Sequence, residues 1–570
     1  MNSDSLTQFC GVAERVSNTT KRLEKAALLA EYFIPQSDEN LSLASRYFAG
    51  QVFSLRDGRT ANIGGAAILK AIEAASQKTS DELRTLLVQH GDFGDVAAGV
   101  LPSREASLSL RDLSNFFNDI SATKGSKSKL EKLITFLEKA DAIEGKYIVK
   151  LLSGDLRIGL QEGAVEDALA RANVLPVGEV QRANMMLGDL GETAVRARHK
   201  TLGEVRMKLF HPLKFMLASP AADLTEVAKQ MPEEFAVEDK FDGIRAQAHI
   251  ALVNDEEVGA DETRYGVVFN GVRIALFSRT LSEITHSFPD LIAPLAALVD
   301  GSTPALLLDG EIVPVNPSAS DERVLPFQVL QQRLNRKVLK PEFLEQIPVA
   351  FIAYDLLFAG EEILLEKPFR ARRSELEKLP AGTANRFRVA HSAYSDDALK
   401  LDDEFDASRA RGNEGLMVKD PNAIYKPGRR GKEWLKIKRA LATLDVVVTS
   451  VEVGSGRRSK VLSDYTFAVR ESAEGSTLLN IGKAYSGLTN KEIAELSEWF
   501  RAHTIQEFAN GKVRTVEPQI VLEIAFDNVQ ISPRHKSGYA LRFPRILRIR
   551  DDKPVSEIDT LETVKKLAEG

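Results

Sequence analysis

The hydrophobic pattern changes twice along the chain, and these changes restrict the fold more than any other feature. Roughly the first 200 residues carry apolar side chains at helical spacing. Beyond them, short β-rich runs alternate with helical patches, and strand patterns dominate the C-terminal part. A chain of 570 residues is also too long for one hydrophobic core. We therefore predict a multi-domain α+β protein with a helical domain at 1–204, an α+β domain at 205–440 and a β-barrel at 441–570.

Local signals place some of the elements. Thr79 with Glu82 predicts a capping box, and Gly91 follows as a suitable helix end. Ser128 with Glu131 predicts a second capping box ahead of an apolar stripe of Leu130, Leu133, Ile134 and Leu137.

Turn and strand signals mark the later domains. Asn270-Gly271 predicts a two-residue hairpin, and PFRARRSELEKL at 368–379 predicts a helix. Four β-rich runs predict strands of the last domain, at 444–454, 465–472, 477–487 and 519–531.

Composition excludes several classes of protein. Cys10 is the only cysteine, which rules out an internal disulfide framework and a zinc site built from several thiolates. The net charge of −6 argues mildly against a nucleic-acid binder, although local clusters such as KPGRRGK at 426–432 matter more than the sum. We find neither a membrane-spanning apolar run nor a secretory signal, so we expect a cytoplasmic protein.

The segment EDKFDGIR at 238–245 carries the main chemical signal. As a free amine, Lys240 could attack the α-phosphorus of a nucleotide and hold AMP as a phosphoramidate. Arg245 and a bound metal would favour loss of the lysine proton. Asp242-Gly243 predicts a tight turn that allows close approach to a nucleotide. Alone, however, Lys-x-Asp-Gly is a weak motif that a solvated turn explains equally well.

Further motifs follow Lys240 in order. They are SRT at 278–280, LDGE at 308–311, YD at 354–355, EGLMVK at 414–419, WLKIK at 434–438 and RDDK at 550–553. This set resembles the nucleotidyltransferase motifs of the ATP-dependent DNA ligases. Three longer segments also look like the eukaryotic replicative ligase and its archaeal relatives: LLSGDLRIGL at 151–160, PFQVLQQR at 326–333 and LRFPRILRIR at 541–550. The resemblance covers nearly the whole chain.

The resemblance implies the fold and the residues that hold the nucleotide. It implies a DNA-binding helical domain, a central adenylation domain and a C-terminal OB-fold. Lys240 would be the adenylated residue, and Glu238 would contact the adenine end of the nucleotide. Arg245 and Arg279 would bind ribose and phosphate, a task suited to a guanidinium fork.

Other contacts follow from the same resemblance. Tyr354 would stack on the adenine ring, where the family often has Phe. Arg430, Lys436 and Lys438 would contact the nucleotide, the two lysines from one side of a strand toward the phosphates. Phe215 stands where the family usually has proline.

Two carboxylates and two cations complete the expected set. Glu311 would reach the ribose hydroxyl or a metal, and Glu414 would hold a metal; separated carboxylates suit Mg²⁺. Arg550 and Lys553 would meet the β- and γ-phosphates of ATP during self-adenylation, which requires the last domain to move onto the site.

The implied activity is ATP-dependent sealing of nicks in duplex DNA. Lys240 would take AMP from ATP, AMP would pass to the 5′-phosphate at a nick, and the 3′-hydroxyl would displace it. The domains would encircle the duplex and contact mainly its backbone. NAD-dependent ligases carry a four-cysteine zinc module, which one cysteine cannot build, so ATP is the expected AMP donor.

Two alternatives remain open at this point. An RNA ligase or an mRNA-capping guanylyltransferase shares the lysine motif, although the helical first third favours DNA ligase. A non-catalytic nick-binding scaffold is the other alternative, which retention of Lys240 and both carboxylates disfavours. We expect a monomer, find no clear sliding-clamp motif, and leave open replication against repair and Mg²⁺ against Mn²⁺.

Overall fold

The computed structural model describes residues 5–57, 59–76, 78–105, 108–221, 223–253, 265–316, 324–333, 340–380, 386–437, 442–454, 458–459 and 461–569. The chain divides into two compact units, Met1–Lys438 and Arg439–Gly570. Boundaries at 204 and 440 remain a prediction. None of the helices in the described ranges is long and apolar enough to cross a membrane.

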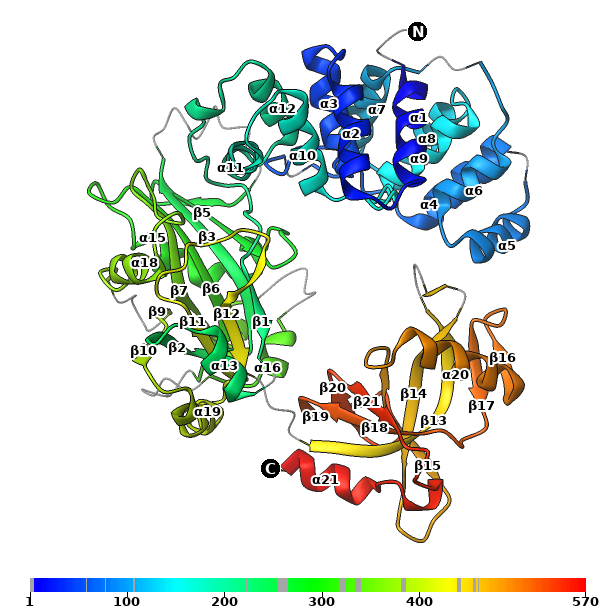
Figure 1. Ribbon diagram of the computed structural model, residues 1–570, viewed down its shortest axis with the longest axis vertical. Coiled ribbons are helices and arrows are strands. Elements are labelled where there is room, and N and C mark those ends of the chain that lie inside the picture. The colour runs from blue at the N-terminus through cyan, green and yellow to red at the C-terminus, as the bar shows by residue number, and fades with distance from the viewer. Residues whose placement is uncertain are drawn as a thin grey trace. The chain divides into compact units, whose positions relative to one another are not determined.

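The N-terminal part of the first unit is helical, as predicted (Figure 1). Its helices are α1 (Leu6–Ser17), α2 (Arg22–Phe33), α3 (Asp38–Phe48), α4 (Gly65–Ser76), α5 (Ser80–His90), α6 (Phe93–Val100), α7 (Leu110–Ala122), α8 (Ser126–Leu137), α9 (Ala142–Leu152), α10 (Glu162–Ala172), α11 (Val177–Leu187) and α12 (Leu190–Arg198), followed by the short η1 (Leu202–Glu204). Their apolar faces share one core.

One of the two predicted capping boxes is confirmed. Thr79 and Glu82 form reciprocal bonds at the start of α5, and Gly91 ends that helix in the left-handed conformation. The prediction for Ser128 was wrong, because α8 already begins at Ser126 after Gly125. The backbone N–H of Lys129 bonds to the Gly125 carbonyl at 3.2 Å, so Ser128 lies inside the first turn and is not a cap.

The central part of the first unit contains two sheets (Figure 1). The five-stranded sheet has the order β1 (Leu217–Pro220), β12 (Arg430–Ile437), β11 (Gly415–Lys419), β2 (Phe235–Lys240) and β10 (Ser392–Ser395). The seven-stranded sheet has the order β4 (Val267–Phe269), β5 (Val272–Ser278), β3 (Ile244–Leu252), β6 (Ala305–Pro314), β7 (Val349–Ala359) and β8 (Glu362–Ile363), with β9 (Phe387–Val389) paired to β7.

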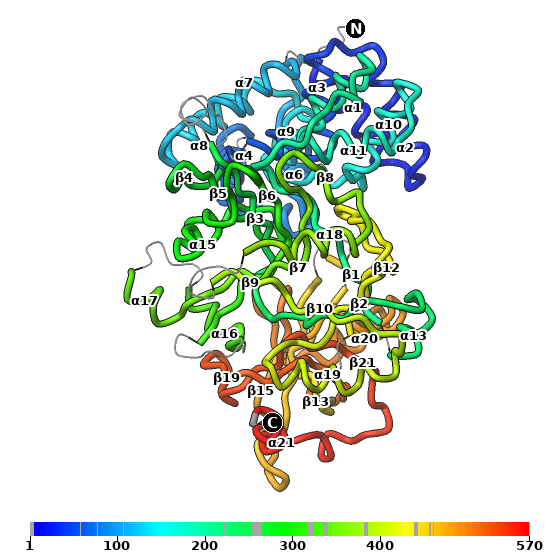
Figure 2. Tube along the Cα trace, turned by 90° about the vertical axis from the view of Figure 1, so that its left-hand side faces the viewer, coloured from blue at the N-terminus to red at the C-terminus, as the bar shows by residue number. Residues whose placement is uncertain are grey.

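Helices accompany these sheets. They are α13 (Leu224–Gln230), η2 (Thr285–Ser287), η3 (Pro289–Leu291), α15 (Ile292–Ala296), α16 (Phe327–Gln331), α17 (Pro341–Gln346), α18 (Phe369–Leu376), η5 (Ala398–Lys400) and α19 (Leu401–Ala410). Two local predictions are confirmed. Asn270 and Gly271, both at positive φ, connect β4 to β5, and α18 lies within 368–379 beside β7 (Figure 2).

Alternation along the strands gives the two sheets inner and outer faces. On β6, Leu306, Leu308 and Ile312 join the core that also contains residues of α15. Leu307 points to the other side and packs with Trp434 of β12, so the two sheets face each other across this layer. Any polar side chain on these inner faces is therefore held between the sheets.

The second unit is a β-rich OB domain (Figure 1). Its elements are β13 (Ala442–Val453), β14 (Leu462–Arg470), β15 (Leu478–Ala484), α20 (Asn490–Ala502), β16 (Thr504–Phe508), β17 (Val513–Val516), β18 (Val521–Phe526), β19 (Asn528–Ile531), β20 (Tyr539–Arg542), β21 (Arg545–Ile549), η7 (Val555–Glu557) and α21 (Leu561–Glu569). The four predicted β-rich runs supply β13, β14, β15 and the pair β18 and β19.

The strands of this unit close on themselves. β13 pairs with β14 on one side and with β18 on the other, β14 pairs with β15, and β18 pairs with β21. The Ile546 N–H of β21 then bonds to the Ser486 carbonyl, just beyond β15, at 2.9 Å. Gly487 has φ +116°, and a Cβ there would lie 1.8 Å from the Ile546 carbonyl oxygen. Closure thus depends on a residue without a side chain.

Two buried histidines lie where the helical part meets the sheets. His211 Nε2 is 3.2 Å from the Met185 carbonyl of α11, and His249 Nδ1 of β3 accepts the Phe210 N–H at 3.1 Å. Burial lowers the pKa of His211 to about 4 and lowers the pKa of His249 well below its ordinary value. Both rings are therefore neutral in the folded chain at neutral pH.

This burial predicts an acid-sensitive stability. The unfolded chain takes up protons at these histidines below about pH 6.5, whereas the folded chain does not, so the free energy of unfolding should fall as pH drops from about 6.5 toward 4. His211→Gln should remove up to about 3 kcal/mol of that fall, measured by urea unfolding at several pH values. The exposed His286→Gln variant should keep the wild-type slope. If the free energy of unfolding of His211→Gln fell with pH as steeply as that of the wild type, the prediction would be contradicted.

Candidate active site

Lys240 ends strand β2 and lies next to Glu414. Strand β2 pairs antiparallel with β11, which places Gly415 opposite Lys240. The Glu414 N–H donates to the Lys240 carbonyl at 2.7 Å, and the Lys240 ammonium forms an ion pair with the Glu414 carboxylate. Their side chains are 21% and 16% exposed, so the pair is accessible at the edge of the interior.

The inner face of the five-stranded sheet carries the predicted cations and carboxylate. Glu238, Met417 of β11 and Lys436 of β12 lie opposite one another, and Lys240 is two positions along from Glu238 on the same face. The alternate residues form an apolar core on the outer face, including Val237, Leu416, Val418, Leu435 and Ile437. Lys438 lies outside the described residues.

Glu238 is a buried carboxylate with two different oxygens. Oε2 forms an ion pair with Lys419 Nζ at 2.6 Å, and both side chains are at most 2% exposed. Oε1 has no hydrogen-bond partner among the described residues and lies 3.8 Å from Arg373 Nη1. Lys419 also lies 5.0 Å from the Tyr354 ring centroid, which brings the two sheets together at this point.

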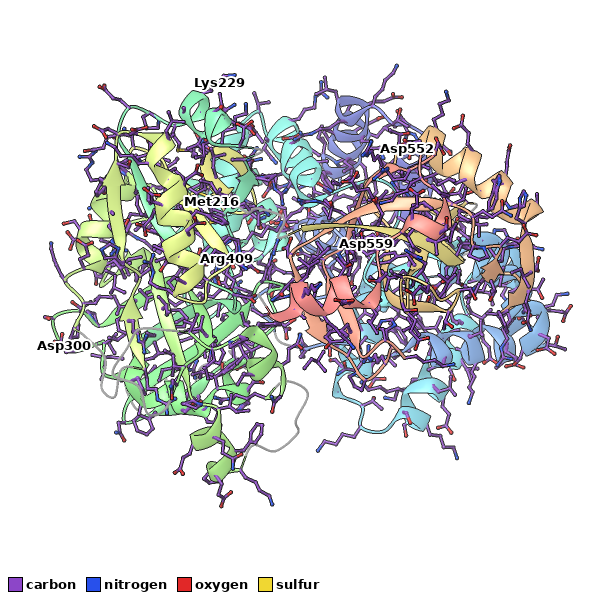
Figure 3. The ribbon with its side chains drawn as sticks, turned by 90° about the horizontal axis from the view of Figure 1, so that it is seen from below. Met216, Lys229, Asp300, Arg409, Asp552 and Asp559 are labelled. Carbon is purple, nitrogen blue, oxygen red and sulfur yellow. The ribbon has the colours of Figure 1, made fainter. Side chains whose placement is uncertain are left out.

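Arg245 is held from several directions. Its guanidinium donates to Asp309 at 2.6 and 3.1 Å and to the Met216 carbonyl at 2.8 Å (Met216 is labelled in Figure 3). Its Cζ atom also lies 4.7 Å from the centroid of the Phe215 ring and 5.7 Å from the centroid of the Tyr354 ring. The aromatic residue at 215 thus contributes a cation–π contact that a proline could not make.

Glu311 joins the same charged group. It lies opposite Arg245 in the pairing of β3 with β6, on the face that holds Asp309. Burial raises the pKa of Glu311 to about 8; Lys240 and Arg245 oppose that rise and Glu414 adds to it. Two cations and two carboxylates are therefore close enough to influence one another.

Gly243 allows the turn after Lys240 to pass close to β6. A Cβ on Gly243 would lie 2.4 Å from the Ile312 carbonyl oxygen and 2.9 Å from Glu311 Cγ. Only a residue without a side chain fits here without moving Glu311. This contact gives a physical reason for the glycine of the Lys-x-Asp-Gly pattern.

Two other arginines predicted to contact the nucleotide, Arg279 and Arg430, are more exposed than Arg245. Arg279 directly follows β5, whose last residue Ser278 pairs with Ala246 of β3, and lies in the turn that the Leu281 N–H closes by bonding to the Ser278 carbonyl at 2.8 Å. It is exposed and has no hydrogen bond or ion pair within the described part of the chain. Arg430 begins β12, opposite Leu217, and is also exposed.

In the second unit, Arg550 and Lys553 share one carboxylate. Asp445 of β13 accepts from Arg550 Nη1 at 2.8 Å and from Lys553 Nζ at 2.7 Å. Asp552, labelled in Figure 3, binds Arg550 at 2.8 Å, and this hydrogen bond lowers the pKa of Asp552 to about 2. The two cations are thus neutralised within their own unit.

Comparison with known proteins gives consistent matches. Three family models match the chain: "DNA ligase N terminus" at residues 5–170, "ATP dependent DNA ligase domain" at 215–438 and "ATP dependent DNA ligase C terminal region" at 458–553. A "Probable DNA ligase" of Koribacter versatilis is 43% identical over 99% of this chain and 96% of its own length. A "DNA ligase" of Archaeoglobus fulgidus is 32% identical over 98% of this chain and 97% of its own.

These matches run along almost the entire chain. The chain belongs to the ATP-dependent DNA ligase family. The ligase uses ATP, and nicked DNA is its substrate. A solved structure named "Pmar-Lig_PreS3" is similar in fold, with a TM-score of 0.56, 15% identity and coverage of 95% of this chain and 99% of that chain.

Several residues of this region were not singled out from the sequence of the ligase. Asp309 and Lys419 lie inside motifs that were recognised, so their motifs could have indicated them. Tyr425 donates to Asp309 Oδ2 at 2.7 Å and accepts the Met216 N–H at 3.0 Å, yet it belongs to no recognised motif. Arg373 gave no signal beyond its place in a predicted helix.

The close packing at Gly243 yields a test. Gly243→Ala should destabilise the ligase by about 1–3 kcal/mol and slow nick sealing, because the added methyl displaces β6 and Glu311. Thermal unfolding and the rate of sealing of a nicked duplex measure both effects. Gly301→Ala is the matched control, since a Cβ there meets nothing within 4 Å. Wild-type sealing by Gly243→Ala would refute the packing argument.

Proposed function

We propose that the ligase carries AMP on Lys240 and transfers it to the 5′-phosphate of a nick. The observation that carries this proposal is the position of Lys240 at the open end of β2, beside Glu414 and electrostatically coupled to Glu311. A lysine in such a place can attack a phosphorus atom while charged neighbours hold the phosphates.

The reaction has three steps. Lys240 Nζ, as the free amine, attacks the α-phosphorus of ATP; an N–P bond forms, and the bond to pyrophosphate breaks. The 5′-phosphate oxygen at the nick then attacks the same phosphorus, which frees Lys240 and forms a DNA adenylate. Finally the 3′-hydroxyl oxygen attacks the 5′-phosphorus, loses its proton, and AMP leaves.

The chain's own residues prepare the first step. Glu414 forms an ion pair with the Lys240 ammonium. Attack requires that this pair separate and that the ammonium lose a proton. Arg245, fixed by Asp309 and Met216, is oriented to bind ribose or phosphate, and Arg279 would add a second contact.

The base would lie between the sheets. Tyr354 would stack on the adenine ring, and Glu238 Oε1 offers an unpaired acceptor to its amino group. Lys436, on the same face as Lys240, would contact phosphate, and Arg430 and Lys438 would add further nucleotide contacts.

Glu311 and Glu414 fit Mg²⁺. The described residues contain no group of three or more His, Cys, Asp or Glu that could hold a metal, so these two carboxylates are the side chains that would hold Mg²⁺ beside the nucleotide. Mg²⁺ is commonly bound in this way, by one or two carboxylates together with substrate phosphates. When bound, it would neutralise charge that develops on the phosphates.

Arg550 and Lys553 would act only in the first step. Both bind Asp445 in the described structure, so contact with the β- and γ-phosphates requires them to exchange this carboxylate for phosphate. Such an exchange would accompany closure of the second unit onto the first, and its reversal would free the site for DNA.

The proposed partner of the ligase is a nicked DNA duplex. We infer that the ligase acts as a monomer that surrounds the duplex and contacts mainly the backbone, in the cytoplasm where ATP and DNA are available. The retained Lys240, Glu311 and Glu414 disfavour a non-catalytic scaffold. The sequence near the N-terminus has no clear sliding-clamp motif, so binding to a clamp is not part of this proposal.

Intact-protein mass spectrometry tests Lys240. Wild-type protein incubated with ATP and Mg²⁺ should gain one AMP and lose it when nicked DNA is added, whereas Lys240→Ala should gain none. Pretreatment with pyrophosphate controls for protein that is purified already adenylated. An AMP adduct on Lys240→Ala, or sealing at the wild-type rate by that variant, would exclude Lys240 as the nucleophile.

A comparison of two steps tests the second unit. Arg550→Ala should lower self-adenylation from ATP about 100-fold, because a cation on the leaving phosphates is lost. The same variant should seal pre-adenylated nicked DNA at close to the wild-type rate. Arg548→Ala is the control, since Arg548 binds Glu523 instead of Asp445. Equal losses in both reactions would contradict a role confined to the first step.

A further inference from the structure

Arg373 of helix α18 points its guanidinium at Glu238. The arginine side chain is 6% exposed and the glutamate side chain 2% exposed. Arg373 Nε donates to Glu377 Oε1 at 2.7 Å, and Nη2 donates to the Ala390 carbonyl at 2.5 Å. The third nitrogen, Nη1, has no hydrogen-bond partner among the described residues. Two bonds thus fix the orientation of a guanidinium whose remaining donor is unused.

The unused donor lies beside an unused acceptor. Arg373 Nη1 and Glu238 Oε1 are 3.8 Å apart, which is too far for a hydrogen bond. Glu238 Oε2 is already engaged by Lys419 at 2.6 Å. Buried polar atoms without partners are costly, and they are kept where a ligand or ordered water supplies the missing bonds. Their closeness suggests that one flat ligand edge satisfies both.

The Watson–Crick edge of adenine has the required pattern. It places an amino donor at position 6 next to a ring-nitrogen acceptor at position 1, whereas guanine places an acceptor at position 6 and a donor at position 1. A fixed acceptor facing position 6 and a fixed donor facing position 1 would bind adenine and oppose guanine.

We propose that Arg373 is a specificity-determining residue of the ligase, which donates from Nη1 to adenine N1 while Glu238 Oε1 accepts from the adenine amino group. This proposal rests on the role proposed above for Glu238. It assigns the choice of ATP over GTP to two side chains from separate elements, α18 and β2. Lys419 supports the pair by holding the second oxygen of Glu238.

Base analogues test the assigned hydrogen bond directly. The 1-deaza analogue of ATP has C–H in place of the N1 acceptor and should be a poorer substrate for wild-type self-adenylation, with kcat/KM about 10- to 100-fold lower, mainly through KM. Arg373→Met should lower kcat/KM for ATP by a similar factor and should use ATP and the 1-deaza analogue almost equally. This non-additivity is a result that a merely structural role would not produce.

Three further variants define the control set. Arg373→Met should also discriminate at least 10-fold less between ATP and GTP, read as AMP and GMP adducts by mass. Arg373→Lys, which keeps a donor, should restore part of this discrimination. Glu377, whose side chain is 54% exposed, is the outer partner of Arg373; Glu377→Gln removes its charge and should leave discrimination unchanged. Glu238→Gln should reduce discrimination independently of Arg373.

The outcomes separate this inference from the proposed function. Equal use of ATP and the 1-deaza analogue by wild-type protein would overturn the role of Arg373, whether or not Arg373→Met folds. If Glu238→Gln loses discrimination while Arg373→Met keeps it, Glu238 alone reads the base and the inference on Arg373 fails. If neither variant changes discrimination while Lys240 still becomes adenylated, both base contacts fail and the covalent mechanism stands.

Discussion

The antiparallel pairing of β2 with β11 is the constraint on which the site depends. It places Gly415 opposite Lys240, and so brings the adjacent Glu414 to the lysine ammonium. The same register aligns Glu238 with Met417, and through β12 with Lys436. Because side chains alternate, the polar residues share the inner face while Val237 and its neighbours form the core behind them. A slip of one residue would exchange these two sets.

Charged side chains on the inner faces are costly to bury, and their arrangement shows how that cost is limited. Arg245 is matched by Asp309, which Tyr425 also hydrogen-bonds, and Glu238 is matched by Lys419. Of these two pairs, the one with Glu238 leaves an oxygen, Oε1, without a hydrogen-bond partner among the described residues. Burial therefore serves orientation more than stability, since such pairs seldom stabilise a fold beyond an apolar alternative.

Much of this arrangement was predictable from the sequence, for identifiable reasons. The Thr79 capping box and the Asn270-Gly271 hairpin are local and were confirmed. The Ser128 cap was wrong because the N-cap is Gly125, three residues or nearly one turn earlier, and the helix begins at Ser126. The contact of Arg373 with Glu238 joins residues far apart in the chain and leaves no periodic or motif signal. The roles of the site residues were predicted from motifs in a fixed order. The structure adds residues that contact them but belong to no motif, such as Arg373.

Asp445 explains how the second unit can carry strong cations without a fixed phosphate contact. It binds both Arg550 and Lys553, so the unit keeps the two cations oriented and neutralised. Phosphate oxygens accept the same kind of charge-assisted hydrogen bonds as this carboxylate, so the proposed exchange would replace each bond by a similar one. Such a replacement would let the cations pass from the carboxylate to phosphate and back. The catalytic cycle proposed here requires that property, since the unit must engage ATP once and then withdraw before DNA is joined.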